Sequence, residues 1–251
     1  AVQRRAKGGG VIGGAATPLS VYVHIPFCES VCYYCACNKV ITKHHEKATE
    51  YLEALRTEIQ MVSAQLGAVQ PLSQLHFGGG TPTFLSDDEL GGLMDTLRTA
   101  FRFVEGGEYA IEIDPRTIDA GRLKRLAAMG FNRLSFGVQD FDPDVQQAVH
   151  RVQPFEQVAE LMQAARDEGF MSINMDLIYG LPKQTTERFQ RTLQQVSSLK
   201  PDRIALYAYA HLPQRLKPQR RIRAADLPKA EDKIGMLSTA IEAFGQAGYD
   251  Y

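Results

Sequence analysis

The chain has 251 residues, 44% of them hydrophobic, which is enough for one large α/β domain with a substantial core. Its 28 Lys and Arg residues balance 29 Asp and Glu residues, so the overall charge gives no reason to expect nucleic acid or an anionic membrane as a partner. No stretch approaches the roughly 18 consecutive apolar residues of a membrane span and no secretory signal pattern opens the chain, so a cytoplasmic protein is expected.

Two regions are expected along the chain. Residues 1–17 combine basic residues, glycines and other small residues without a periodic apolar face, which predicts a flexible leader. In residues 18–251, short apolar runs alternate with longer amphipathic stretches, the pattern of repeated βα units around a parallel sheet in one α/β domain. Strands are predicted at 19–25, 72–77, 109–114, 133–138, 172–178 and 203–207. Helices are predicted near 46–66, 86–102, 117–129, 154–168, 185–199 and 228–247. Functional residues of such folds gather at the carboxyl ends of the strands.

All four cysteines, Cys28, Cys32, Cys35 and Cys37, follow the first predicted strand within ten residues, in HIPFCESVCYYCACN. This crowding suits a metal or a cluster better than disulfides. Thiolates are the usual ligands of iron–sulfur clusters, and the C-x3-C-x2-C spacing lets one loop wrap a cubane through Cys28, Cys32 and Cys35, with one iron left open. Cys37 is too close to Cys35 for unstrained joint ligation, so it is expected to be a small buried thiol or a group beside the cluster.

A structural zinc site that uses Cys32 and Cys35 is the alternative reading of this loop. Zinc sites usually bring two pairs of ligands from separate places, whereas these cysteines all lie together. A zinc-stapled binding module would be colourless and would contain zinc but no acid-labile sulfide.

Glycines and a carboxylate mark the second and third predicted strands. The glycines at 78–80 let the backbone approach a ligand closely, although a tight βα turn would need them as well. Glu112 interrupts an apolar strand, where a carboxylate requires a ligand or a partner such as Arg133. Asp114 and Arg116 are expected only to terminate that strand.

Polar residues also follow the later strands. Gln139 and Asp176 end the fourth and fifth strands and Arg151 follows shortly after Gln139, so these three are expected to converge at the mouth of the barrel. The segment 215–223, RLKPQRRIR, carries five basic residues and is either a solvated loop or an anion site. Nucleic acid is a rival partner for this segment, but no interleaved aromatic residues support it.

The cysteine loop after a first strand resembles that of the radical S-adenosylmethionine superfamily. With GGGTPT, EIDPR, FNRLSFGVQDF, NMDLIYGLP and YAHLP, the chain from about residue 18 onward is similar to the oxygen-independent coproporphyrinogen III oxidases. The resemblance implies a partial (β/α)6 TIM-like barrel of the radical SAM type. In the family a further segment precedes the barrel and a helical C-terminal domain follows it, and neither is expected within this chain.

The resemblance also implies cofactors and the residues that contact them. A [4Fe–4S] cluster would be held by Cys28, Cys32 and Cys35, and two molecules of S-adenosylmethionine would bind. The first molecule would contact Tyr22, Gly79 and Glu112. The second would contact Tyr34, Gly80, Thr81, Gln139, Arg151, Asp176 and Ala210.

The implied reaction is the oxidative decarboxylation of two propionates of coproporphyrinogen III to vinyl groups by a 5′-deoxyadenosyl radical. The product is protoporphyrinogen IX, in haem biosynthesis. The enzyme is expected to be a monomer that uses an unidentified electron donor and acceptor, and arginines in 215–223 would suit the substrate carboxylates. The alternative is a haem chaperone-like paralogue that binds tetrapyrrole without decarboxylating it, but such paralogues usually lack a cysteine at the position of Cys37.

Overall fold

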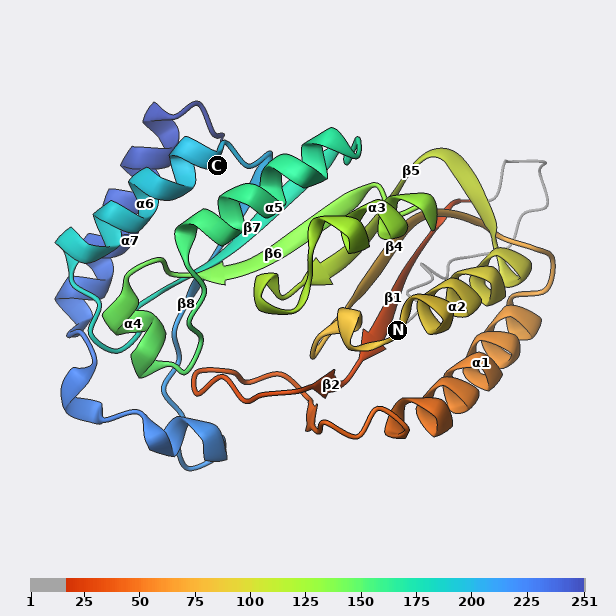
Figure 1. Ribbon diagram of the computed structural model, residues 1–251, viewed down its shortest axis with the longest axis horizontal. Coiled ribbons are helices and arrows are strands. Elements are labelled where there is room, and N and C mark those ends of the chain that lie inside the picture. Colours follow the sequence, from red (N-terminus) through yellow and green to blue (C-terminus); the bar gives the residue numbers. More distant parts are fainter. Residues whose placement is uncertain (1–16, 251) are drawn as a thin grey trace, which may run out of the picture.

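The structure, a computed structural model, describes residues 17–250, and its main sheet is curved and parallel (Figure 1). The leader predicted at 1–17 lies outside the described residues except for Thr17, so it stays a prediction. The sheet has six strands in the order β1-β4-β5-β6-β7-β8, which confirms the partial barrel. These strands are β1 (Leu19–Ile25), β4 (Pro71–Gly79), β5 (Arg102–Ile113), β6 (Arg133–Gln139), β7 (Ser172–Tyr179) and β8 (Arg203–Ala208).

The third strand of the main sheet, β5, is much longer than predicted. The third predicted strand was placed at 109–114, whereas β5 begins at Arg102. Arg102 and Phe103 pair with the start of β4, and the pairing then shifts register before it resumes at Glu108. The interruption hid the first part of the strand because its glycines at 106 and 107 are typical of a turn.

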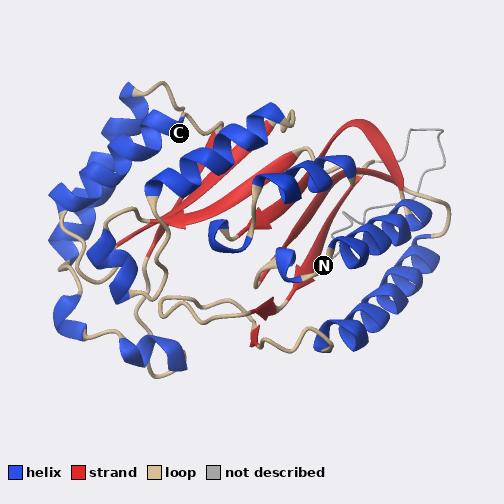
Figure 2. Ribbon diagram, viewed as in Figure 1, coloured by secondary structure: helices blue, strands red, loops and turns tan. Residues whose placement is uncertain are grey.

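Helices lie along the outer face of the curved sheet (Figures 1 and 2). The longer ones are α1 (Lys47–Leu66), α2 (Asp87–Ala100), α3 (Ala120–Ala128), α5 (Phe155–Asp167), α6 (Thr186–Leu199) and α7 (Ala230–Gln246). The shorter ones are α4 (Pro143–Ala148) and the 3-10 turns η1 (Pro82–Phe84), η2 (Pro115–Thr117), η3 (Lys217–Arg221) and η4 (Ala224–Asp226). Helix α4 was not predicted, because six residues are too few to show a helical period. Within residues 17–250, no helix is both long and apolar enough to cross a membrane.

The two faces of the sheet differ in polarity. In β1, Val21, Val23 and Ile25 are buried in the main core together with residues of the outer helices, whereas Tyr22 points to the other face and is 39% exposed. Alternation of this kind places successive side chains on opposite faces. The inner face is therefore free to carry polar side chains near the carboxyl ends of the strands.

The turn after β4 packs against the start of the cysteine loop and is hydrogen-bonded to the end of β1. The loop leaves β1 through β2 (Phe27–Cys28), which pairs with β3 (Val40–Ile41) and so closes the loop at its base. The Gly80 N–H donates to the Ile25 carbonyl at 2.8 Å, so the two backbones run side by side. A Cβ atom at Gly80 would lie 2.7 Å from the carbonyl oxygens of Pro26 and Phe27, so only glycine allows this approach.

The buried carboxylate of Asp140 ties the segment that joins β6 to α4 onto helix α6. Asp140 is 2% exposed and accepts hydrogen bonds from the Thr192 hydroxyl at 2.9 Å, from the Asp142 N–H at 2.6 Å and from the Gln184 amide. Burial raises the pKa of Asp140 to about 6, although these hydrogen bonds oppose the shift. The anchor fixes the segment that runs from Gln139 to Arg151.

Replacing Gly80 with alanine is expected to lower the free energy of unfolding by about 1–3 kcal/mol, because backbone atoms must move to admit the methyl group. Gly91→Ala is the matched control: Gly91 lies inside α2 with open space where a Cβ atom would lie, so alanine there should stabilise by about 0.5–1 kcal/mol. Urea unfolding followed by circular dichroism measures both effects. A Gly80→Ala protein as stable as the wild type would contradict the close approach.

Asp140 should make stability depend on pH. Its folded-state pKa of about 6 lies above the unfolded value of about 4, so its contribution is complete below pH 4 and is lost as the pH rises to 6. The loss should amount to about 2–3 kcal/mol. Asp140→Asn is expected to be less stable than the wild type at every pH, because the Gln184 amide then faces a second donor. Its free energy of unfolding should not fall between pH 4 and 6, because asparagine does not ionise. Equal slopes for the two proteins between pH 4 and 6 would refute the assignment.

Candidate active site

A cavity of about 700 Å³ opens at the carboxyl ends of the strands and is lined by all four cysteines. Most of the residues predicted to contact cofactors line it too, which confirms that Gln139, Arg151 and Asp176 converge there. The predicted contacts in the lining are Tyr34, Gly79, Gly80, Thr81, Glu112, Gln139, Arg151 and Asp176. The sheet edge and the cysteine loop thus form one site.

The four thiols differ in exposure. Cys32 is buried, Cys28 and Cys35 are half-buried, and the Thr81 hydroxyl donates to the Cys28 sulfur at 3.5 Å. Cys37 was expected to be a small buried thiol or a group beside the cluster; it is exposed, so the first alternative is wrong, and it lines the same cavity as the other three cysteines. The neighbouring Cys37 side chain holds the pKa of the Cys35 thiol below its usual value, and Lys39, whose Nζ donates to the Cys35 carbonyl at 3.0 Å, acts in the same direction.

The donor set of the loop fits a cluster better than a single ion. Among residues 17–250, no three His, Cys, Asp or Glu side chains form a group that could hold one metal ion. A cubane is wider than one ion, so its thiolates stand farther apart on the loop that wraps it. Three free thiols that line one cavity, with Cys28 and Cys35 open to it, therefore match a cluster and do not favour the structural zinc alternative.

The far side of the cysteine loop is held by segments from the second half of the chain. The Tyr33 N–H donates to the Val149 carbonyl at 2.9 Å, and the Gln219 side chain donates to the Tyr34 carbonyl at 3.0 Å. The Arg221 guanidinium lies over the Tyr33 ring, 5.1 Å from its centroid. The basic segment 215–223 therefore lies against the cysteine loop, a neighbourhood that the sequence did not indicate.

Glu112 faces the cavity, but its partner is not the one that the sequence suggested. Its carboxylate contacts His76 Nε2 at 3.0 Å and accepts from the Gly79 N–H at 3.2 Å. Arg133, the expected partner, pairs with Glu108, nearer the middle of β5. The Glu112 carboxylate is thus held at the glycine turn, with room for a further donor from a ligand.

Tyr22 and Ala210 do not belong to the lining of the cavity. The Tyr22 ring stacks on the His76 ring with centroids 5.8 Å apart, so it lies one side chain away from Glu112. The Ala210 carbonyl accepts a hydrogen bond from Gln219, which also binds the cysteine loop. The contacts of both residues with a cofactor stay predictions.

Asp176 of β7 and Gln139 at the end of β6 line the same cavity. Asp176 accepts hydrogen bonds from the Ser135 hydroxyl at 3.0 Å and from the Asn174 amide at 2.9 Å, and burial raises its pKa. Gln139 has a φ of 70°, a left-handed conformation that is costly for a residue with a Cβ and that clusters at functional sites. Both residues therefore present polar groups to the cavity.

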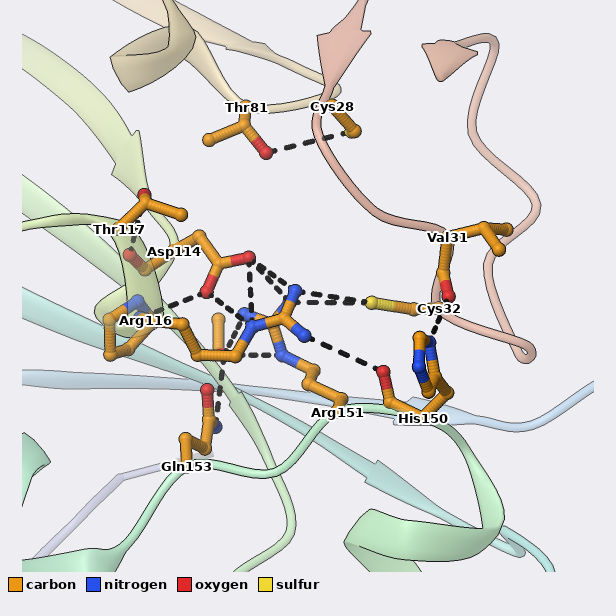
Figure 3. Close-up of polar contacts among 12 residues, drawn as sticks. Cys28, Val31, Cys32, Thr81, Asp114, Arg116, Thr117, His150, Arg151 and Gln153 are labelled. Carbon is orange, nitrogen blue, oxygen red and sulfur yellow. Dashed lines mark hydrogen bonds and ion pairs between the residues drawn. The ribbon is translucent and has the colours of Figure 1, made fainter. Parts of the chain in front are cut away.

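Two arginines and one carboxylate surround Cys32 (Figure 3). Arg116 Nη2 lies 2.7 Å from Asp114 Oδ2 and 3.5 Å from the Cys32 sulfur. Arg151 Nη1 lies 3.0 Å from the same oxygen and 3.6 Å from the same sulfur. Burial alone would raise the pKa of Asp114, but Arg151 and Arg116 lower it to about 2, so the carboxylate is ionised at neutral pH.

Asp114 and Arg116 are site residues that the sequence reasoning missed. They were expected only to terminate a strand, whereas Asp114 caps η2 and both side chains line the cavity. The sequence feature that could have indicated them is an acidic and a basic residue two positions apart at the carboxyl end of a strand, where functional residues gather.

Comparison with known proteins agrees with this geometry. The family model of the Radical SAM superfamily matches residues 22–196. The chain is 53% identical to the oxygen-independent coproporphyrinogen III oxidase of Pseudomonas aeruginosa over 239 residues, which are 94% of this chain and 52% of that protein. The solved coproporphyrinogen III oxidase of Escherichia coli, a radical SAM enzyme, superimposes with a TM-score of 0.90 and 48% identity.

That superposition covers 94% of this chain and 54% of the E. coli chain. The chain thus spans about half the length of these relatives. Because the family model covers most of the described residues, from β1 to α6, the chain belongs to the radical SAM superfamily.

Proposed function

We propose that this chain carries out the radical chemistry of an oxygen-independent coproporphyrinogen III oxidase, in which two propionates of coproporphyrinogen III become vinyl groups. The observation that supports this most directly is that the cysteine loop, the glycine turn and Glu112 share one cavity. The relatives named for this reaction are about half identical to the chain over nearly its whole length.

In this proposal Cys28, Cys32 and Cys35 hold a [4Fe–4S] cluster whose fourth iron is left for S-adenosylmethionine. When bound, the cluster and S-adenosylmethionine together supply the radical that starts the oxidative decarboxylation of a propionate. The Thr81 hydroxyl donates to the Cys28 sulfur at 3.5 Å. Burial raises the pKa of the Cys28 thiol, and this hydrogen bond opposes the shift and so favours the thiolate form that ligation requires.

The glycine turn and Glu112 would bind the first S-adenosylmethionine. Glu112 keeps its orientation through His76 and the Gly79 N–H, so its carboxylate can accept from a ribose hydroxyl. A Cβ atom at Gly79 would lie 2.7 Å from the His24 ring and 2.9 Å from the Ile25 carbonyl oxygen, so glycine there lets the turn pack against β1 while its backbone lines the cavity. Asp176, Gln139 and Arg151 line the same cavity and would bind the second molecule.

The basic segment 215–223 would bind the substrate. The side chains of Arg215, Lys217, Arg220, Arg221 and Arg223 are all exposed, and η3, which carries three of them, is tied through Gln219 to the cysteine loop. A tetrapyrrole with four carboxylates would be held there by charge-assisted hydrogen bonds, with a propionate directed toward the cavity. Burial of the bound substrate would then keep water from the radical.

Anaerobic reconstitution with iron and sulfide, followed by assay of 5′-deoxyadenosine and carbon dioxide released from coproporphyrinogen with dithionite as reductant, tests the proposal. Both products should form together. Stable haem binding without release of carbon dioxide would instead identify a chaperone-like protein. A colourless protein that contains zinc and no labile sulfide would refute the proposed chemistry.

Single alanine substitutions test the ligand set. Cys28→Ala, Cys32→Ala and Cys35→Ala should each abolish the cluster, as measured by iron, labile sulfide and visible absorption, because three thiolates are the minimum that holds a cubane with an open iron. Cys37→Ala is the matched control from the same loop, and it should retain the cluster. Loss of the cluster in Cys37→Ala, or its retention in any of the other three, would overturn this assignment.

A further inference from the structure

A charged group beside Cys32 has no role in the proposed function. Arg116 follows β5 in η2, and its guanidinium reaches back across the cavity wall to the cysteine loop (Figure 3). Nothing in the binding of S-adenosylmethionine or substrate, as proposed above, requires it. Its place against a sulfur that would ligate iron calls for a physical explanation.

The Arg116 side chain is held firmly in this place. Its Nε donates to Asp114 Oδ1 at 3.0 Å and its Nη2 to Asp114 Oδ2 at 2.7 Å, so the guanidinium binds the carboxylate through both oxygens. A further nitrogen, Nη1, points to the carbonyl of His150 at 3.5 Å. With 20% of the side chain exposed, little water can reorient or screen the charge.

The charges around the Cys32 sulfur do not cancel. Arg116 and Arg151 each carry a positive charge within hydrogen-bond distance of the sulfur, at 3.5 and 3.6 Å. The carboxylate between them, Asp114, supplies only one negative charge, since its pKa of about 2 keeps it ionised. One net positive charge therefore lies at this corner of the loop.

We propose that Arg116 raises the reduction potential of the iron–sulfur cluster by holding its positive charge and an N–H group against the sulfur of Cys32. A cubane in the 2+ state with three thiolates has a net charge of −1, and one added electron makes it −2. A fixed positive charge stabilises the second state more than the first, and hydrogen bonds to cluster sulfurs act in the same direction. Arg116 is thus a positioning residue for charge and touches no substrate.

This inference rests on the proposed ligation by Cys28, Cys32 and Cys35, but it can fail separately from it. If the wild-type protein forms no cubane, the proposed function fails. If the cubane forms and substitution of Arg116 leaves its potential unchanged, only the role of Arg116 fails.

The test is the midpoint potential of the reconstituted cluster, without S-adenosylmethionine or substrate. Dithionite gives one electron to each cluster in the presence of redox mediators, and electron paramagnetic resonance measures the fraction in the 1+ state. Arg116→Gln, which removes the charge, should lower the ratio of reduced to oxidised cluster at least threefold at a fixed ambient potential. For a one-electron couple this is about 28 mV, at about 59 mV per tenfold change.

Arg188→Gln is the matched control. Arg188 also binds aspartates, with its Nη1 2.9 Å from Asp142 and 2.8 Å from Asp144, but it lies on α6 away from the cysteine loop. Its substitution should leave the midpoint unchanged, whereas an equal shift in both variants would overturn the proposal.

Arg116→Lys covers the case in which Arg116→Gln does not load a cluster. Lysine keeps the charge but lacks the planar fork that contacts Asp114 and the sulfur together, so its midpoint should fall by less than that of Arg116→Gln but remain below the wild type. If a variant holds a cluster and the midpoint potential of that cluster equals the wild-type value, the proposed role of Arg116 in raising the potential is refuted. Failure of both to hold a cluster would refute it too, since Arg116 would then serve the stability of the loop.

Discussion

The buried carboxylate of Asp114 is the interaction on which the cavity depends. It is ionised at neutral pH and binds two guanidiniums, and these in turn contact the Cys32 sulfur and the carbonyls of Gly137 and His150. One negative charge thus joins the end of β5, the segment around α4 and the cysteine loop. Without it, the buried Arg151 and the half-buried Arg116 would lose their shared counter-charge, at a cost of several kcal/mol.

The parallel sheet explains why these groups meet at all. Every strand of the sheet runs in the same direction, so all six carboxyl ends lie at one edge, where the loops between strands and helices carry the polar residues. The outer face is covered by helices, which leaves the inner face for ligands (Figure 2). The glycine turn after β4 completes the arrangement, because it brings the backbone of the second βα unit against the chain that leaves β1.

In the proposed function, cofactor chemistry and substrate recognition would meet at the cysteine loop. One side of the loop faces the cavity and the other contacts η3 of the basic segment through Gln219 and Arg221. A carboxylated substrate held by this segment would lie next to the cofactors. This proximity connects the proposed decarboxylation to side chains that are far apart in the sequence.

By itself, the sequence determined the features that depend on neighbours along the chain: the order of the strands, the spacing of the cysteines in one loop and the glycine turn. Only the tertiary structure decided which partners meet across the sheet. It paired Glu112 with His76 and not Arg133, left Cys37 exposed, and brought Arg116 to Cys32 across 84 positions of the chain. The reason is physical. Local patterns follow from backbone geometry within a few residues, whereas contacts between strands depend on register and on packing, which no single stretch of sequence contains.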